Sequence, residues 1–179
     1  MSMRRLVVPA VGTALLLAVA SPVSAGLMER KAEGACTISP WTREYEAPTG
    51  QWLLLEFRWG AATDELVQEF LDKTSITATL DGKTLKLTSL EYDEIWLDET
   101  VDPAVTVPGW YPFVFMQYLI HPLRPGVHAV GTYWVTLEAL TDGWYLFDEG
   151  HVWEGVSTVV VTPRGQFPTG QYQEACPIQ

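Results

Sequence analysis

Short stretches of alternating apolar and polar residues run along most of the chain, a pattern typical of β-strands. The segment 51–60, QWLLLEFRWG, is apolar at nearly every position and predicts a central strand buried on both faces. Further strands are predicted around 95–97 and over 110–120, 126–137 and 156–163. Pro112 should restrict the first residues of its strand to an edge or a bulge, because proline cannot donate to a ladder.

One segment breaks this period and predicts a helix over 61–75. Thr63 is a plausible N-cap, and Asp64 and Glu65 would place negative charge in the first turn, where it is favourable. Apolar residues then recur at helical spacing. We expect a single short helix inserted into an otherwise β fold.

The clearest local signal is a β-hairpin over 76–87. Asp81 and Gly82 form a two-residue turn suited to type I′, which requires positive φ at both positions. The resulting register sets Ala78 opposite Leu85, and threonines and a lysine fall on the other face.

Together these elements predict an all-β fold, an antiparallel Ig-like β-sandwich of about seven to eight strands with one short helix insertion. The segment 121–140, HPLRPGVHAVGTYWVTLEAL, adds a resemblance. It resembles the L-x-P-G-x-H-x-V element of bacterial Ig-like and fibronectin-type-III-like modules, and the chain is similar to secreted bacterial proteins of that kind. The matching residues are Leu123, Pro125, Gly126, His128 and Val130.

The resemblance implies a corner between two sheets, formed by the leucine and the Pro-Gly pair. It implies that His128 is a corner histidine whose ring packs and hydrogen-bonds to backbone. The strand that follows alternates, and the face chosen as core carries Ala129, Gly131, Tyr133, Val135 and Leu137. The resemblance covers about 20 residues and supports a fold rather than a function.

The first 25 residues predict an export signal. Arg4 and Arg5 precede an apolar run over 6–20, and small residues lead up to Ala25, as at a signal-peptidase site. About 15 apolar residues fall short of the roughly 20 that span a bilayer. We expect cleavage near Ala25, no membrane insertion afterwards, and a location outside the cell or in the cell envelope.

The mature chain, residues 26–179, is long enough for one core and is predicted to be a single domain. The chain carries a formal net charge of −11. The predicted signal holds two of its arginines and no acids, so the mature chain would carry −13. Such a charge argues against nucleic acid and anionic membrane as partners.

The two cysteines, Cys36 and Cys176, flank nearly the whole mature chain. Export to an oxidising compartment predicts one disulfide that joins the two ends. The alternative, a redox or metal-binding thiol pair, would normally show close spacing such as C-x-x-C.

No motif predicts catalysis or a cofactor. The chain lacks a G-x-S-x-G elbow, and none of its 22 acids is marked as part of a catalytic pair. A metal site is not expected: Asp148, His151 and Glu154 are loosely spaced, His121 should lie in a loop, and the acidic run 91–102 lacks a calcium-loop pattern.

The remaining feature is aromatic content, with eight Trp, seven Tyr and six Phe. Some must fill the core, but two pairs sit beside turns at predicted strand ends and could form an exposed platform. The candidate binding residues are Trp110, Tyr111, Trp144, Tyr145 and Trp153. The alternative is that loops fold back and bury them.

The sequence therefore favours a secreted, non-catalytic binding module with an unknown protein or carbohydrate partner. One alternative is a carbohydrate-binding module that uses the loop aromatics. A second is a secreted hydrolase with an unidentified carboxylate pair.

Overall fold

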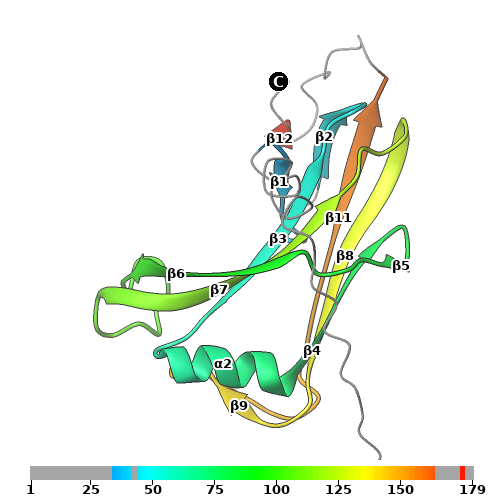
Figure 1. The fold of residues 1–179 in the computed structure, drawn as a ribbon. Coiled ribbons are helices and arrows are strands. Elements are labelled where there is room, and N and C mark those ends of the chain that lie inside the picture. The colour runs from blue at the N-terminus through cyan, green and yellow to red at the C-terminus, as the bar shows by residue number, and fades with distance from the viewer. Residues whose placement is uncertain (1–33, 42–43, 164–173, 176–179) are drawn as a thin grey trace, which may run out of the picture.

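The computed structural model describes residues 34–41, 44–163 and 174–175 (Figure 1). Its four-stranded sheet has the order β1 (Cys36–Ile38), β3 (Leu53–Gly60), β7 (Gly109–Ile120), β6 (Ser89–Leu97). Its six-stranded sheet has the order β12 (Glu174–Ala175), β2 (Glu44–Pro48), β11 (Val152–Thr162), β8 (Gly126–Thr136), β4 (Thr74–Leu80), β5 (Lys83–Thr84). Helix α2 (Asp64–Lys73) and a small hairpin of β9 (Leu140–Thr141) and β10 (Leu146–Phe147) complete the described elements.

The fold is mostly β with one short helix, as predicted, but its sheets are mixed rather than antiparallel. β1 pairs in parallel with β3, and β2 pairs in parallel with both β11 and β12. The reason is that the two short strands at the start of the described chain lie in different sheets, each beside a strand that runs in the same direction. No helix among the described residues is long and apolar enough to cross a bilayer.

Two of the sequence predictions fall on residues outside the described part of the chain. The predicted signal, residues 1–25, is one. The other is the disulfide, because Cys176 is not described, although β12 ends one residue before it and Cys36 is the first residue of β1. Both stay predictions.

Within the described part of the chain, one hydrophobic core joins the two sheets. Strand β3 contributes Leu53, Leu55, Phe57 and Trp59, all buried. The opposite face of β3 holds a buried leucine, a half-buried glutamate and the exposed Arg58. The prediction that this strand is buried on both faces is therefore wrong beyond its first residues.

Strand β8 faces the core with the side opposite to the predicted one. Val130 and Trp134 are buried, whereas Tyr133 on the other face is 45% exposed. Trp134 decides the orientation, because its ring lies 5.0 Å from the ring of Phe57 and 5.7 Å from that of Phe70. Burying this indole among other core rings removes a large apolar area from water.

Helix α2 closes the core below the sheets (Figure 1). Thr63 occupies the N-cap position with extended backbone, but its side chain makes no capping hydrogen bond. Val67 and Phe70 are buried, and the Phe70 ring stacks on Trp59 with centroids 4.2 Å apart.

The type I′ turn is confirmed by positive φ at Asp81 (49°) and Gly82 (75°). The predicted register is also confirmed, because the Leu85 N–H donates to the Ala78 carbonyl at 2.8 Å. The hairpin is shorter than predicted, since β5 ends at Thr84 and the chain then crosses to the other sheet as β6.

Candidate functional site

The β6–β7 hairpin reaches beyond the six-stranded sheet, toward the left of the view in Figure 1. Val114 and Met116 of β7 are fully buried in the core. Side chains two residues apart lie on the same face of a strand, so Pro112 and Trp110 continue this face outward. We call the outer part of it the hairpin face; it consists of Tyr92, Glu94 and Trp96 of β6 and Trp110 and Pro112 of β7.

Three large aromatic side chains of the hairpin face are exposed to solvent. Trp96 and Trp110 are direct cross-strand partners, with ring centroids 5.9 Å apart and planes at 75°. Their exposed fractions are 47% and 64%, and Tyr92 is 58% exposed. Edge-to-face contact stabilises the tryptophan pair while leaving much of each ring free for a partner.

A groove of about 300 Å³ lies beside Tyr92, where the start of α2 meets the hairpin. Its lining residues are Asp64, Tyr92, Asp93, Glu94, Pro112 and Phe113. Three of these carry carboxylates and none carries a positive charge. The groove lining is therefore acidic, and the nearby positive charge is that of Arg58, whose guanidinium carbon lies 5.7 Å from the centroid of the Phe113 ring.

A second aromatic group, the tip cluster, consists of Tyr111 of β7 and of Trp144 and Tyr145 in the turn between β9 and β10. The rings of Tyr111 and Trp144 lie 5.0 Å apart and nearly perpendicular. The Tyr145 hydroxyl donates to Asp102 Oδ1 at 3.2 Å, and this hydrogen bond raises the pKa of Tyr145. Buried Asp142 orders the turn, because its Oδ1 accepts from the N–H groups of Trp144 and Tyr145 at 2.8 and 2.7 Å.

The five aromatic residues that the sequence singled out are thus divided among three places. Trp110 belongs to the hairpin face, and Tyr111, Trp144 and Tyr145 to the tip cluster. Trp153 is half-buried and turned toward the core, with its ring 5.3 Å from that of Trp59 and 5.0 Å from that of Phe147.

Sequence reasoning missed the β6 side of the hairpin face. Tyr92, Glu94 and Trp96 alternate with acidic and aliphatic residues, which is a strand pattern. The acidic residues of 91–94 were instead considered as part of a possible calcium-binding run. The signal that would have found this face is the placement of Trp96 and Trp110 on either side of one loop.

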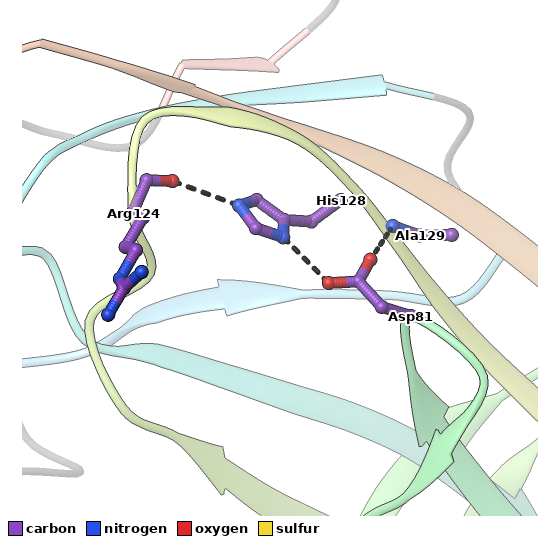
Figure 2. A network of polar contacts seen from close by, with 4 residues as sticks. All are labelled: Asp81, Arg124, His128 and Ala129. Carbon is purple, nitrogen blue, oxygen red and sulfur yellow. Dashed lines mark hydrogen bonds and ion pairs between the residues drawn. The ribbon is translucent and has the colours of Figure 1, made fainter.

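The histidine of the Pro-Gly corner is structural in its contacts (Figure 2). His128 Nδ1 lies 2.8 Å from Asp81 Oδ2, and its Nε2 lies 2.9 Å from the Arg124 carbonyl oxygen. Asp81 Oδ1 also accepts from the Ala129 N–H at 2.9 Å. The ring hydrogen-bonds to backbone as the resemblance implied, and in addition it ties the β4–β5 turn to the corner.

Electrostatics at this corner follow from those contacts. The Asp81 carboxylate raises the pKa of His128, with a further contribution from the Arg124 carbonyl and opposition from burial. The same hydrogen bond lowers the pKa of Asp81. The pair therefore favours an imidazolium beside a carboxylate.

The described residues hold no group of three or more His, Cys, Asp or Glu side chains that could bind a metal ion. The rings of His121 and His151 each pack against a tryptophan, Trp52 at 4.5 Å and Trp153 at 4.4 Å. In the acidic run 91–102, Asp98 Oδ1 accepts from the Thr100 N–H at 2.9 Å.

Comparison with known proteins gives no family. No protein-family model matches the chain, and no curated protein matches it. Among solved structures, the cysteine protease inhibitor EhICP2 from Entamoeba histolytica aligns with a TM-score of 0.36 at 10% identity, over 72% of this chain and 96% of that one. The solution structure of Amebosin aligns with a TM-score of 0.27 at 8% identity, over 72% and 98%. The structure of PbICP-C in its complex with falcipain-2 aligns with a TM-score of 0.29 at 11% identity, over 73% of this chain and 100% of that one. At these scores the likenesses support no assignment of fold or function.

Proposed function

We propose that this protein is an exported, non-catalytic binding module and that the hairpin face is its binding surface. The observation that carries the proposal is the exposed aromatic side chains of Trp96, Trp110 and Tyr92, on a strand face continuous with the core. Exposed aromatic patches of this kind are typical of interaction sites, since their burial against a partner is favourable. The hairpin is held on its inner part by buried β7 residues, so the rings are presented on a supported element.

Carbohydrate binding is the second candidate, and the geometry of the tryptophan pair favours it. Two indoles at 75° form a corner in which one ring can stack on a sugar and the other can contact its edge. Glu94 lies between Tyr92 and Trp96 on the same face and can accept hydrogen bonds from sugar hydroxyls. The hydrolase alternative has no comparable support, because no observation selects a pair among the groove carboxylates.

We also infer that the fold is Ig-like and that the protein is exported. Two sheets around one core support the first inference, and the charged, apolar and small-residue regions of 1–25 support the second. The mass of the mature protein tests export, with cleavage expected near Ala25.

The binding function is tested by screening immobilised mature protein against a random-peptide display library and a panel of soluble polysaccharides. Each recovered ligand is then titrated against Trp110→Ala and against Tyr133→Ala. Tyr133 is the matched control because it is an exposed aromatic residue, at 45%, on the outer face of the other sheet.

We expect Trp110→Ala to weaken binding about tenfold or more, since truncating a central aromatic anchor costs well over 1 kcal/mol. Tyr133→Ala should leave the affinity unchanged. Ligands that bind both variants equally, or the absence of any ligand in both screens, would contradict the proposal. A polysaccharide ligand would select the second candidate.

A further inference from the structure

Strand β6 forms one edge of the four-stranded sheet. It runs for nine residues, Ser89–Leu97, and β7 is its one neighbour among the described strands. An edge strand of this length presents a row of backbone groups to which another extended chain can pair.

Pro112 shows which backbone groups of β6 face outward. It lies one residue beyond the last β3–β7 pair, Gly60 with Phe113, and its carbonyl accepts from the Ala61 N–H at 3.1 Å. The backbone of Pro112 therefore points away from β6, and Pro112 with its partner Glu94 is a non-hydrogen-bonded pair. Proline is tolerated at such a position because no N–H is needed there.

A hydrogen bond of Glu94 in β6 also shows that its backbone faces away from β7. Its N–H donates to the side-chain Oδ1 of the preceding residue, Asp93, at 2.8 Å rather than to β7. Backbone direction alternates along a strand, so the N–H and C=O groups of Tyr92, Glu94 and Trp96 all face the open edge. These are the same three residues whose side chains form the β6 half of the hairpin face.

Charge decides which chain fits this edge. The strand carries Glu91, Asp93 and Glu94 and no lysine or arginine, and Asp64 of α2 adds a carboxylate to the adjoining groove. A second copy paired through β6 would bring acidic strands side by side, which is unfavourable. A basic chain would instead place its cations beside Glu94 on one face and beside Glu91 and Asp93 on the other.

We propose that β6 binds an extended basic peptide segment by strand addition, with alternate side chains of that segment lying along the hairpin face. This proposal rests on the proposed binding function and names its partner class. Backbone hydrogen bonds to Tyr92, Glu94 and Trp96 supply the pairing, and the Asp93 carboxylate releases the Glu94 N–H when the peptide binds. The aromatic rings contact aliphatic stems, and the carboxylates select positive charge.

The experiment uses calorimetry to titrate the mature protein with a synthetic nine-residue peptide. In this peptide lysine alternates with valine or threonine. Two further peptides carry N-methyl groups, one at the odd and one at the even positions, so that each lacks the N–H groups of one edge. We expect the unmodified peptide and one methylated peptide to bind, and the other to lose about tenfold or more in affinity. Equal binding of both methylated peptides, or no binding of the unmodified one, would overturn strand addition.

Two variants of Glu94 separate the contribution of its backbone N–H from that of its side-chain charge. Glu94→Pro removes one outward N–H and should weaken the peptide more than Glu94→Gln, which removes the charge alone. If Glu94→Pro lowers the melting temperature strongly, the methylated peptides still decide the question. A glutamate-valine peptide of equal length should not bind, and binding of the lysine peptide should weaken with added salt.

The outcomes distinguish failure of this proposal from failure of the binding function. Ligands that depend on Trp110 but are indifferent to Glu94→Pro would keep the binding function and overturn strand addition. A dimer of the free protein, seen by sedimentation and lost in Glu94→Pro, would overturn it in favour of self-pairing.

Discussion

At the scale of single residues, His128 shows how a side chain can be fixed by acceptors on both sides. Both ring nitrogens face oxygen acceptors, Asp81 Oδ2 and the Arg124 carbonyl. A neutral imidazole has one N–H and leaves one of these contacts without a proton, whereas the imidazolium donates to both. Because the side chain is only 17% exposed, water does little to relieve the mismatch in the neutral form.

The first prediction is a pH-dependent stability of this corner. The raised pKa of His128 adds stability that is complete below its ordinary value of 6.5 and is lost as pH rises through the folded pKa. The lowered pKa of Asp81 adds stability that is present above 3.8 and is lost as pH falls through the folded pKa. The wild-type protein should therefore have a higher free energy of unfolding than Asp81→Asn. The difference should be largest between pH 3.8 and pH 6.5 and should shrink at alkaline pH.

Urea unfolding at several pH values measures this difference. Asparagine is a fair replacement because it tolerates the positive φ of position 81 and can still accept from the Ala129 N–H. Imidazole chemical shifts should show that the pKa of His128 falls in the variant. An unchanged titration of His128 would show that the carboxylate does not set it.

A second prediction separates a structural histidine from a metal ligand. His128→Ala should lower the free energy of unfolding by roughly 1 to 3 kcal/mol, through lost packing and unpaired acceptors. The loss should be the same in chelator and in micromolar zinc. A zinc-dependent rise in the wild-type melting temperature that His128→Ala abolishes would instead indicate a metal site.

At the scale of elements, features set by neighbouring residues were predictable and those set by distant partners were not. The turn at Asp81 and Gly82 depends on positive φ, which is a property of those two residues. The orientation of β8 depends on what Trp134 meets across the core, and both faces of that strand carry apolar residues. The parallel pairing of β2 with β11 joins segments more than a hundred residues apart, and no local pattern records it.

The candidate site divides in the same way. The sequence placed Trp110 beside a turn at a strand end, and that placement is what exposes it. Trp153 has an equally suggestive neighbourhood but lies against Trp59 and Phe147, since the core closes over it from other elements. Local sequence cannot separate these two tryptophans, because the difference lies in what packs on them.

The third prediction concerns the turn of the β4–β5 hairpin. Gly82→Ala should destabilise the protein by about 1 to 2 kcal/mol, because a side chain is strained at φ 75° even though no atom lies within 4 Å of the added Cβ. Gly109→Ala is the control, since Gly109 lies in a strand and its added Cβ would make ordinary contacts. Thermal unfolding of both variants measures the effect, and equal melting temperatures would argue against strain at the turn.

At the scale of the whole molecule, some tryptophans stabilise the core and others form an exposed surface. Trp134 is 2% exposed at the junction of both sheets and α2, whereas Trp110 is 64% exposed on the projecting hairpin. Core and candidate surface are therefore built from the same residue type on connected elements. The hairpin can present aromatic rings because its inner half is anchored in the core.

The fourth prediction uses this contrast. Trp134→Ala should lower the free energy of unfolding by about 3 to 5 kcal/mol, the usual cost of truncating a large buried aromatic side chain. Trp110→Ala should change it by less than about 1 kcal/mol, because most of the ring is already in water apart from its contact with Trp96. Chemical denaturation gives both values. A loss of several kcal/mol for Trp110→Ala would mean that the pair supports the fold rather than a partner.

The last prediction concerns how the ends of the mature chain are held. Cys36 begins β1 in the four-stranded sheet, and Cys176 directly follows β12 at the edge of the six-stranded sheet. A disulfide between them would close a loop of nearly the whole domain, and the chain-entropy model gives about 4 to 5 kcal/mol for a loop of that length. Reduction of the exported protein should therefore lower its melting temperature markedly. The double variant Cys36→Ala with Cys176→Ala should melt at a similarly lowered temperature and should not respond to reductant. Two titratable thiols in the unreduced, denatured protein would show that the bond is not formed.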